Sequence, residues 1–187
     1  MPFAFCPTAL ADVVRIDPTT FLDERGSFRE TFKASDFADA GIPTDFVQTN
    51  LSVSKPGVLR GLHFQIDPEA QGKLVSCSAG AVFDVAVDLR HGSPSFGQWI
   101  GEELSVENGR MLWIPAGFAH GFCVLEGDAV LTYSVTSPYS GPHDGGIAWN
   151  DQEIGVVWPV AEPVLSDKDR ALPLLRNGDP GFRYSAG

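Results

Sequence analysis

The sequence has few basic residues and no long apolar run, and each shortage excludes a class of protein. Thirteen Lys and Arg residues against 24 Asp and Glu give a formal net charge of −11, which argues against a nucleic-acid partner. No stretch approaches the ~20 apolar residues of a membrane span. The N-terminal segment lacks a basic region and reaches Asp12 early, unlike a secretory signal peptide. We therefore expect a protein that contacts neither nucleic acid nor a membrane.

Cysteine is also scarce. Cys6, Cys77 and Cys123 are odd in number and show neither metal-ligand nor redox spacing. We therefore expect reduced thiols in a cytoplasmic protein.

Glycine and proline are abundant, at 20 and 14 residues, which favours short strands and turns over long helices. Segments suited to strands recur at short spacing. They lie at 12–17, 27–32, 46–54, two segments within 74–89 on either side of Gly80, 98–106, 111–115 and 129–136. Because the sequence has no repeat or linker, all 187 residues are predicted to form one domain (residues 1–187), an antiparallel β sandwich or barrel.

Two features stand apart from this strand pattern. Short helices are predicted over 36–40, capped by Ser35, and near the C-terminus over 170–175. The segment AVFDVAVDL is apolar except for Asp84 and Asp88. At least one of these two acids is therefore expected to be buried.

The stretch GVLRGLHFQIDPEAQGK gathers candidate catalytic residues. His63 lies in its middle, with Arg60 three residues before and Lys73 ten residues after. A neutral imidazole near cations is a ready proton acceptor, because the cations oppose its protonation and hold a developing negative charge. A lone histidine is more often a hydrogen-bonded core residue. The presence of His120 and Tyr133 on other inward-looking strands favours a functional site instead.

A metal site is an alternative reading of these residues. Jelly-roll metalloproteins of the cupin type use a His-x-His pair, a Glu four residues later, and a second His after a Pro-x-Gly turn. This sequence has His63, Gln65 and Glu69 at the first spacing, and His120 after Pro115-Ala116-Gly117. Glutamine is a weak ligand for a transition metal, and the neighbouring Arg and Lys side chains repel a divalent cation. We take the barrel from this match and expect no metal and no other cofactor.

Eight motifs then identify a family resemblance. They are DERGSFRETF, QTNLSVSKPGVLRGLHFQ, QGKLV, VFDVAVDLR, SPSFGQW, LWIPAGFAHGF, IAWND and LSDKD. They run in order from Asp23 to Asp169 and resemble the dTDP-4-dehydrorhamnose 3,5-epimerase family. The resemblance implies an all-β fold, a cupin-like antiparallel jelly-roll barrel with short peripheral helices. It also implies a homodimer that needs no metal.

The resemblance further implies a reaction and its catalytic residues. The family inverts C3 and C5 of dTDP-4-keto-6-deoxy-D-glucose by removing the acidic protons beside the C4 ketone, which gives dTDP-4-keto-L-rhamnose. His63 matches the general base, and Asp169 matches the carboxylate that orients it. Tyr133 matches the acid on the other face of the sugar. Lys73 matches the cation near the ketone oxygen, where an enolate forms.

Other residues match the positions that bind the nucleotide sugar in this family. Arg60 suits a diphosphate, because a guanidinium binds such oxygens in a fork. Phe28 and Tyr139 are candidates to stack on the base. Because some ligands come from the partner subunit in this family, Arg25 and Glu30 are expected to serve the neighbour's site. The whole predicted binding set is Arg25, Phe28, Glu30, Gln48, Asn50, Arg60, His120, Tyr139, Asp144 and Lys168.

Two positions depart from the family pattern and keep alternatives open. Ser134 stands where a lysine is expected, and Asp144 stands where a glutamate is expected. Both are expected to lie by the donor strand and the nucleotide end of the site. A mono-epimerase that inverts only C3 or C5 of a related dTDP-4-keto-6-deoxy sugar is the first alternative. A metal-dependent cupin enzyme and a non-catalytic sugar-binding cupin are alternatives from other classes.

Overall fold

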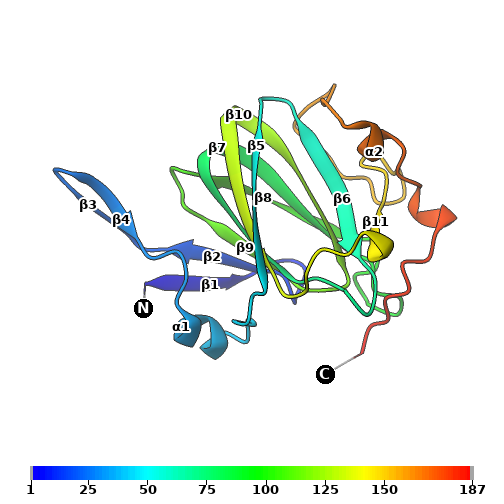
Figure 1. Ribbon diagram of the computed structural model, residues 1–187, viewed down its shortest axis with the longest axis horizontal. Coiled ribbons are helices and arrows are strands. Elements are labelled where there is room, and N and C mark those ends of the chain that lie inside the picture. Colours follow the sequence, from blue (N-terminus) through cyan, green and yellow to red (C-terminus); the bar gives the residue numbers. More distant parts are fainter. Residues whose placement is uncertain (1, 186–187) are drawn as a thin grey trace.

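The protein is built mainly from antiparallel strands with a few short helices (Figure 1). A computed structural model describes residues 2–185. The elements are β1 (Phe3–Pro7), β2 (Val14–Pro18), β3 (Thr20–Asp23), β4 (Gly26–Arg29), α1 (Ala34–Asp39), β5 (Gln48–Ser54), β6 (Leu59–Gln65), β7 (Lys73–Asp88), β8 (Trp99–Ser105), β9 (Met111–Ile114), β10 (Phe118–Val135), η1 (Gly141–His143), β11 (Asp144–Gly146), α2 (Asp167–Arg170) and η2 (Leu175–Asn177). Within the described residues, no helix is long and apolar enough to cross a membrane.

The two long strands β7 and β10 pair with each other through the centre of the fold. The start of β7 also pairs with β9, and its later part pairs with β8. In the same way, the start of β10 pairs with β6 and its end pairs with β5. Because each long strand changes its second partner halfway, the nine-stranded sheet folds over on itself. This architecture confirms the predicted all-β, cupin-like jelly-roll barrel.

The bend in β7 lies at Gly80, where the prediction of two separate strands is wrong. Gly80 has a φ of 66°, in the left-handed region that glycine adopts without a steric penalty. A Cβ atom there would lie 2.7 Å from the carbonyl oxygen of Glu126. The chain therefore bends without ending the strand. β10 likewise extends well beyond the predicted strand 129–136, because register shifts midway along it absorb its bend.

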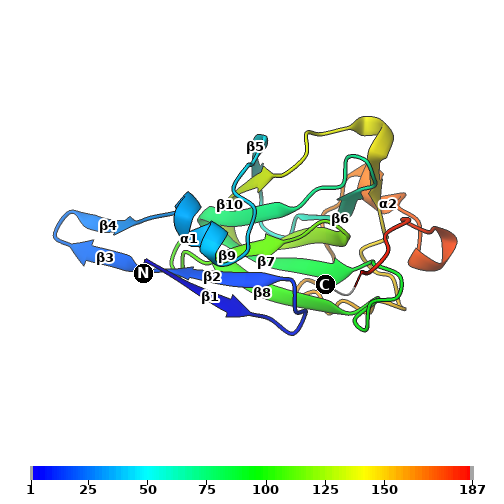
Figure 2. The same ribbon diagram turned by 90° about the horizontal axis from the view of Figure 1, so that it is seen from below.

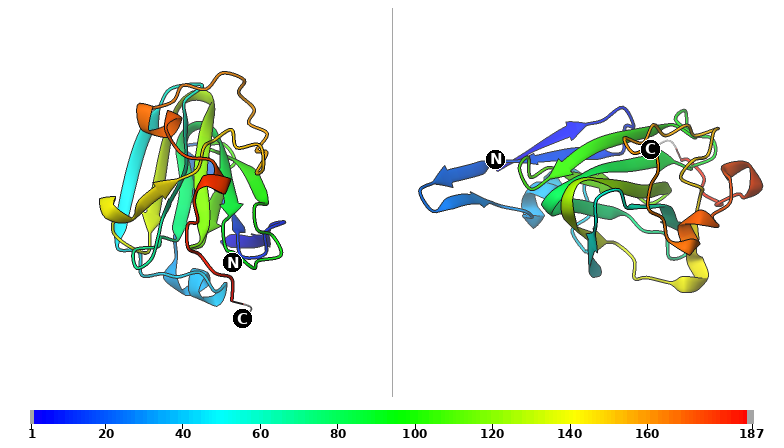
Figure 3. Two further views of the ribbon diagram at one scale, coloured as in Figure 1. Left: turned by 90° about the vertical axis from the view of Figure 1, so that its right-hand side faces the viewer. Right: turned by 90° about the horizontal axis from the view of Figure 1, so that it is seen from above.

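The hairpin β3–β4 projects from the barrel as an arm. The period-two alternation of residues 27–32 predicts a half-buried strand, but β4 ends at Arg29 and its residues are mostly exposed. Three apolar side chains of the arm, Phe21, Leu22 and Phe28, are 56%, 80% and 65% exposed. The arm and α2 lie at opposite ends of the molecule (Figures 2 and 3). The arm therefore exposes apolar surface far from the C-terminal helices.

Neither predicted helix has the bounds that the sequence suggested. The N-cap of α1 is Lys33, not Ser35, whose hydroxyl donates to Asp36 Oδ1 at 3.0 Å instead. The predicted C-terminal helix over 170–175 is wrong, because α2 ends where that helix was expected to begin. Pro173 lies within the segment and cannot donate a helical hydrogen bond.

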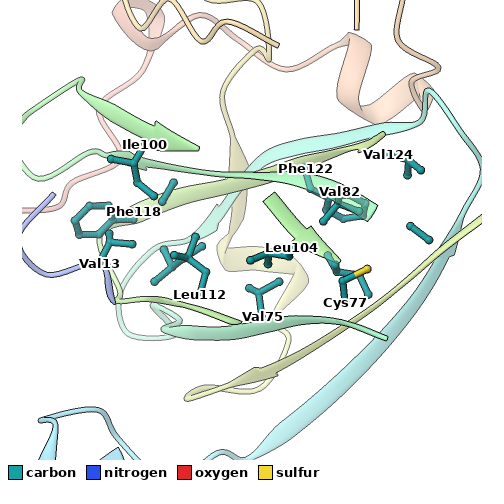
Figure 4. Close-up of a cluster of buried hydrophobic side chains, with 14 of the residues drawn as sticks. Val13, Val75, Cys77, Val82, Ile100, Leu104, Leu112, Phe118, Phe122 and Val124 are labelled. Atoms are coloured by element: carbon teal, nitrogen blue, oxygen red, sulfur yellow. The ribbon is translucent and has the colours of Figure 1, made fainter. Parts of the chain in front are cut away.

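Apolar side chains from both long strands and their neighbours fill the barrel (Figure 4). Val75, Leu104 and Leu112 are fully buried there. Burying one such side chain stabilises the fold by roughly 1.5–3 kcal/mol. Asp84 and Asp88 are also fully buried, which confirms the prediction that at least one of these acids is inside.

Leu104→Ala is expected to lower the free energy of unfolding by about 2–5 kcal/mol, because the truncation leaves a cavity in the core. Val157→Ala is the control, because Val157 is 74% exposed and its truncation changes the free energy by less than about 0.5 kcal/mol. Urea unfolding followed by tryptophan fluorescence measures both. Equal effects would contradict the position of Leu104 in the core.

Candidate active site

A cavity of about 510 Å³ opens between β5, β6, β10 and α2. All the predicted catalytic residues line it, as do all the predicted binding residues except Arg25, Phe28 and Glu30. The lining residues are Gln48, Asn50, Ser52, Arg60, His63, Phe64, Gln65, Gln71, Lys73, His120, Phe122, Tyr133, Tyr139, Asp144, Ser166, Lys168 and Asp169. The fold thus brings side chains of β5, β6, β7, β10, β11 and α2 together in one cavity.

Strand alternation decides which side chains of β5 reach the cavity. Gln48, Asn50 and Ser52 line it. The residues between them point to the other side, where Leu51 and Val53 are 63% and 58% exposed. One face of β5 therefore forms the cavity wall, and the other face is a separate apolar surface.

His63 is held by the carboxylate of Asp169. Its Nε2 lies 2.6 Å from Asp169 Oδ1. Ser166, the N-cap of α2, donates its hydroxyl to Asp169 Oδ2 at 2.7 Å. Burial acts to raise the pKa of Asp169, but the hydrogen bonds from His63 and Ser166 outweigh it and lower the pKa. An ionised Asp169 fixes Nε2 of His63 as a donor and leaves Nδ1 as the proton acceptor.

Lys73 places a buried positive charge beside this pair. Its Nζ donates to the His63 carbonyl oxygen at 3.3 Å, and the residue is 7% exposed. Burial lowers the pKa of Lys73 to about 8. The carboxylates of Asp144 and Asp84 oppose this shift, whereas the ammonium of Lys168 adds to it. The cation is therefore still the main form at pH 7 and is ready to bind a developing oxyanion.

Tyr133 lines the cavity from β10, opposite Asn50 of β5 in the strand register. Burial raises the pKa of its phenol, and the nearby Arg60 acts in the opposite direction. A raised pKa keeps the phenol protonated at neutral pH, so that Tyr133 can donate a proton. Arg60 is steered by a hydrogen bond from its Nε to Ser54 Oγ at 3.0 Å.

A second histidine–carboxylate pair lies next to the first. His120 pairs with His63 across β10 and β6, and its Nε2 is 2.8 Å from Asp84 Oδ2. Asp84 is fully buried, and its Oδ1 has no hydrogen-bond partner among the described residues. Asp88, buried on the same strand, accepts hydrogen bonds from Arg90 and two serines. An under-bonded buried carboxylate is costly, and here it orients His120 and opposes the loss of the Lys73 proton.

The two positions that depart from the family pattern lie in different environments. Asp144 lines the cavity and forms an ion pair with Lys168. Ser134 does not line the cavity, and its Oγ lies 2.9 Å from Thr49 Oγ1 on the outer side of β5 and β10. Ser134 therefore lies on the strand that carries Tyr133, as expected, but its side chain does not face the cavity. Strand alternation turns its side chain away from that of Tyr133.

The structure does not bring Arg25, Phe28 and Glu30 to the cavity of their own chain. Arg25 and Phe28 belong to the arm, Glu30 directly follows it, and the arm lies at the end of the molecule opposite α2 (Figure 1). Arg25 forms an ion pair with Asp23 within the arm. The role of Arg25 and Glu30 in a neighbouring subunit stays a prediction, as does the stacking of Phe28 on the base.

The residues of the metal alternative do not form a ligand set. The Nε2 of Gln65 donates to the carbonyl oxygens of Glu69 and Pro138, at 2.7 and 3.1 Å, and its Oε1 accepts from Ser140 N at 2.7 Å. The Glu69 side chain is not part of the cavity lining. Within residues 2–185, no group of three or more His, Cys, Asp and Glu side chains could hold a metal ion.

Sequence reasoning missed some of the residues that shape the cavity. Ser166 orients Asp169, Asp84 orients His120, and Gln71 lines the wall. The pattern Ser-x-x-Asp at Ser166 is typical of a helix N-terminus and was a usable signal. The partner of Asp84 lies on another strand, and no local pattern indicates it.

Moving a proton beside a carbonyl group needs a base, an acid and a cation for the enolate oxygen. An imidazole, a phenol and an ammonium group, those of His63, Tyr133 and Lys73, line this one cavity. The cupin-like fold and these side chains are the features expected of an isomerase class that uses acid–base chemistry.

Comparison with known proteins identifies the family. The family model described as dTDP-4-dehydrorhamnose 3,5-epimerase matches residues 7–177. The chain belongs to this family of isomerases, which confirms the resemblance seen in its motifs and the 3,5-epimerase activity that the resemblance implies.

Relatives and solved structures agree with this assignment. The dTDP-4-dehydrorhamnose 3,5-epimerase of Shigella flexneri is 54% identical over 163 residues, which cover 87% of this chain and 90% of the relative. A Legionella pneumophila 3,5-epimerase, solved in complex with dTDP-4-keto-L-rhamnose, has a TM-score of 0.94 and 47% identity, covering 98% of this chain and all of that one. A Bacillus anthracis 3,5-epimerase with TDP and PPi bound has a TM-score of 0.89 and 46% identity, covering 92% and 99%.

The Lys73 ammonium is expected to titrate with a midpoint near 8. Asp84→Asn removes a negative charge and should lower this midpoint, whereas Lys168→Gln removes a positive charge and should raise it. NMR of protein carrying ¹³C-labelled lysine follows the titration. His63 and His120 also face the cavity, so the histidine signals are recorded in parallel. A midpoint that neither variant moves would contradict the charge environment described here.

Proposed function

We propose that this cavity carries out both inversions of the family reaction on a dTDP-linked 4-keto-6-deoxyhexose, with His63 as the base and Tyr133 as the acid. The contact that best supports this assignment is the 2.6 Å distance between His63 Nε2 and Asp169 Oδ1. It leaves Nδ1 of His63 free to accept a proton. The relatives solved with dTDP-4-keto-L-rhamnose and with TDP support the nucleotide-sugar substrate.

The first step breaks a C–H bond beside the C4 ketone. His63 Nδ1 takes the proton, and the electron pair of that bond moves into the ketone to form an enolate. The Lys73 ammonium stabilises the enolate oxygen, because a buried cation in a water-poor site acts on charge that appears during the reaction. Asp169 stabilises the imidazolium that results.

The second step returns a proton to the opposite face of the same carbon. The Tyr133 phenol donates this proton, the enolate electrons form the new C–H bond, and the ketone is restored. Its raised pKa suits this role, because the proton stays on the phenol until a carbanion-like centre is presented. His63 then releases its proton to solvent, and Tyr133 takes a proton from solvent, so that both residues can act on the second carbon.

The remaining cavity residues are assigned to binding. Arg60 and Lys168 provide positive charge for the diphosphate. Tyr139 is 63% exposed at the cavity and is assigned to stacking on the base. Asn50 and His120 contact the sugar end of the substrate.

The protein is proposed to act as a homodimer in which the arm of one subunit completes the cavity of the other. The apolar residues of the arm and the outer face of β5 are exposed in the single chain, with Phe28 at 65% and Leu51 at 63%. Exposed apolar surface of this kind is typical of a protein interface. Arg25, Phe28 and Glu30 would then reach the neighbour's site.

A cytoplasmic location is proposed from the cysteines. Cys6, Cys77 and Cys123 are all free thiols, and two of them are buried. Disulfides would be expected more often in an oxidising compartment.

Proton exchange in D₂O tests the assignment of base and acid. Wild-type protein incubated with dTDP-4-keto-6-deoxyglucose is expected to incorporate deuterium at C3 and C5 and to form the L-lyxo product, as followed by NMR. His63→Ala should slow exchange by roughly 10²–10⁴-fold, the usual worth of a positioned base. Tyr133→Phe should keep exchange but lose inversion, because deuterium then returns from the His63 side.

The matched control is His91→Ala, because His91 lies outside the cavity lining. It should exchange like the wild type. Exchange at one carbon only would indicate a mono-epimerase. Full exchange in His63→Ala would contradict the role of His63.

Mixing two inactive variants tests the proposed exchange of arms. Arg25→Ala removes a group of the arm, and His63→Ala removes the base of the barrel. In a mixed dimer, one cavity then combines an intact barrel with an intact arm, so partial activity should return after the two variants are unfolded and refolded together. If the arm served its own chain, no mixture would regain activity. A single-subunit mass near 20.1 kDa in sedimentation would also contradict the dimer.

A further inference from the structure

The segment Ser137–Ser140 forms the part of the cavity wall that carries Tyr139. It lies between β10 and η1 and pairs with no strand. It contains Pro138, and the side chain of Tyr139 is 63% exposed. A segment of this kind needs other partners for its main-chain groups if it is to keep one conformation.

Glutamine side chains supply these partners. Ser137 O accepts from Gln71 Nε2 at 2.7 Å. Tyr139 N donates to Gln48 Oε1 at 2.9 Å. Ser140 N donates to Gln65 Oε1 at 2.7 Å, and the Nε2 of the same side chain donates to the Pro138 carbonyl oxygen at 3.1 Å. Four consecutive residues are thus held by three glutamines.

The three glutamines come from separate parts of the fold. Gln48 begins β5, Gln65 ends β6, and Gln71 precedes β7. Gln65 is 3% exposed, and its second Nε2 hydrogen bond, to the Glu69 carbonyl oxygen at 2.7 Å, uses its remaining donor. Gln65 therefore has no N–H group left for a ligand, although it lines the cavity. Its side-chain amide instead holds the main chain of the segment Ser137–Ser140.

We infer that Gln65 and Gln71 are positioning residues that, together with Gln48, hold Tyr139 ready to receive the nucleotide base. This inference rests on the proposed nucleotide-sugar substrate. Three separate elements fix the segment, so its ordering is complete before the ligand arrives. Binding then loses less conformational entropy than it would with a mobile wall. We call Gln48, Gln65 and Gln71 the glutamine clamp. The clamp thus acts on the affinity for the nucleotide half of the substrate and not on proton transfer.

Binding of dTDP, measured by calorimetry, tests the clamp. Gln71→Leu removes one hydrogen bond to the segment and is expected to weaken dTDP binding about tenfold. Gln65→Leu removes two such bonds and is expected to weaken binding at least as much. Values of kcat should stay within about twofold of wild type while KM rises, because the base and acid are untouched. Gln98→Leu is the matched control, since the amide of Gln98 donates to Pro94 O at 3.4 Å and lies outside the cavity lining.

A double-mutant cycle with Tyr139→Ala separates this role from general stability. If the clamp acts through Tyr139, adding Gln71→Leu to Tyr139→Ala should weaken dTDP binding no further. Additive losses would overturn the inference. Gln71 is less buried than Gln65. The Gln71→Leu variants therefore decide the test even if Gln65→Leu does not fold.

The controls also separate this inference from the proposed function. Wild-type protein that fails to bind dTDP would overturn the nucleotide assignment and the clamp with it. Wild-type binding together with unchanged affinity in both glutamine variants would overturn the clamp alone. A fall in kcat with constant KM would also overturn it, because that result assigns the glutamines to the chemical step.

Discussion

The antiparallel pairing of β7 with β10 is the constraint on which the site depends. It fixes Lys73 opposite Val135 and His120 opposite Ala86. His63, Lys73 and Tyr133 therefore lie on strands whose positions are set by main-chain pairing and core packing rather than by loops. Side chains on such a scaffold keep their mutual geometry, which is what proton transfer between fixed groups requires.

The cavity wall contains several buried charged side chains, each of which would destabilise the fold without a partner. Lys73, Asp84 and Asp169 are all nearly inaccessible to water. Isolated, each would cost several kcal/mol, and each is offset by an opposite charge or a hydrogen bond from another strand. The offset is incomplete at Asp84, where one oxygen lacks a partner among the described residues. This region therefore trades stability for a prepared electrostatic environment.

Strand alternation predicted an antiparallel sandwich or barrel, because alternation is a property of short segments, and the family resemblance of eight ordered motifs implied most of the cavity residues. The patterns failed where distant residues decide the structure. The strand Phe3–Pro7 was missed because its pairing with β2, rather than alternation, defines it. The strand over 27–32 was expected to be half-buried, since its alternation indicates a covered face, but its own chain does not cover that face. Gln65 was considered only as a metal ligand, because its backbone partners lie up to 75 residues away.

The two-sided character of β5 has a consequence for how the sequence can change during evolution. The side chains of its seven residues face alternately the cavity and the outer apolar surface. A deletion or insertion of one residue would exchange the two faces, so that Leu51 entered the cavity and Asn50 faced outward. The cavity wall and the exposed apolar face therefore depend on the same register, so that the strand tolerates substitutions more readily than a change in length.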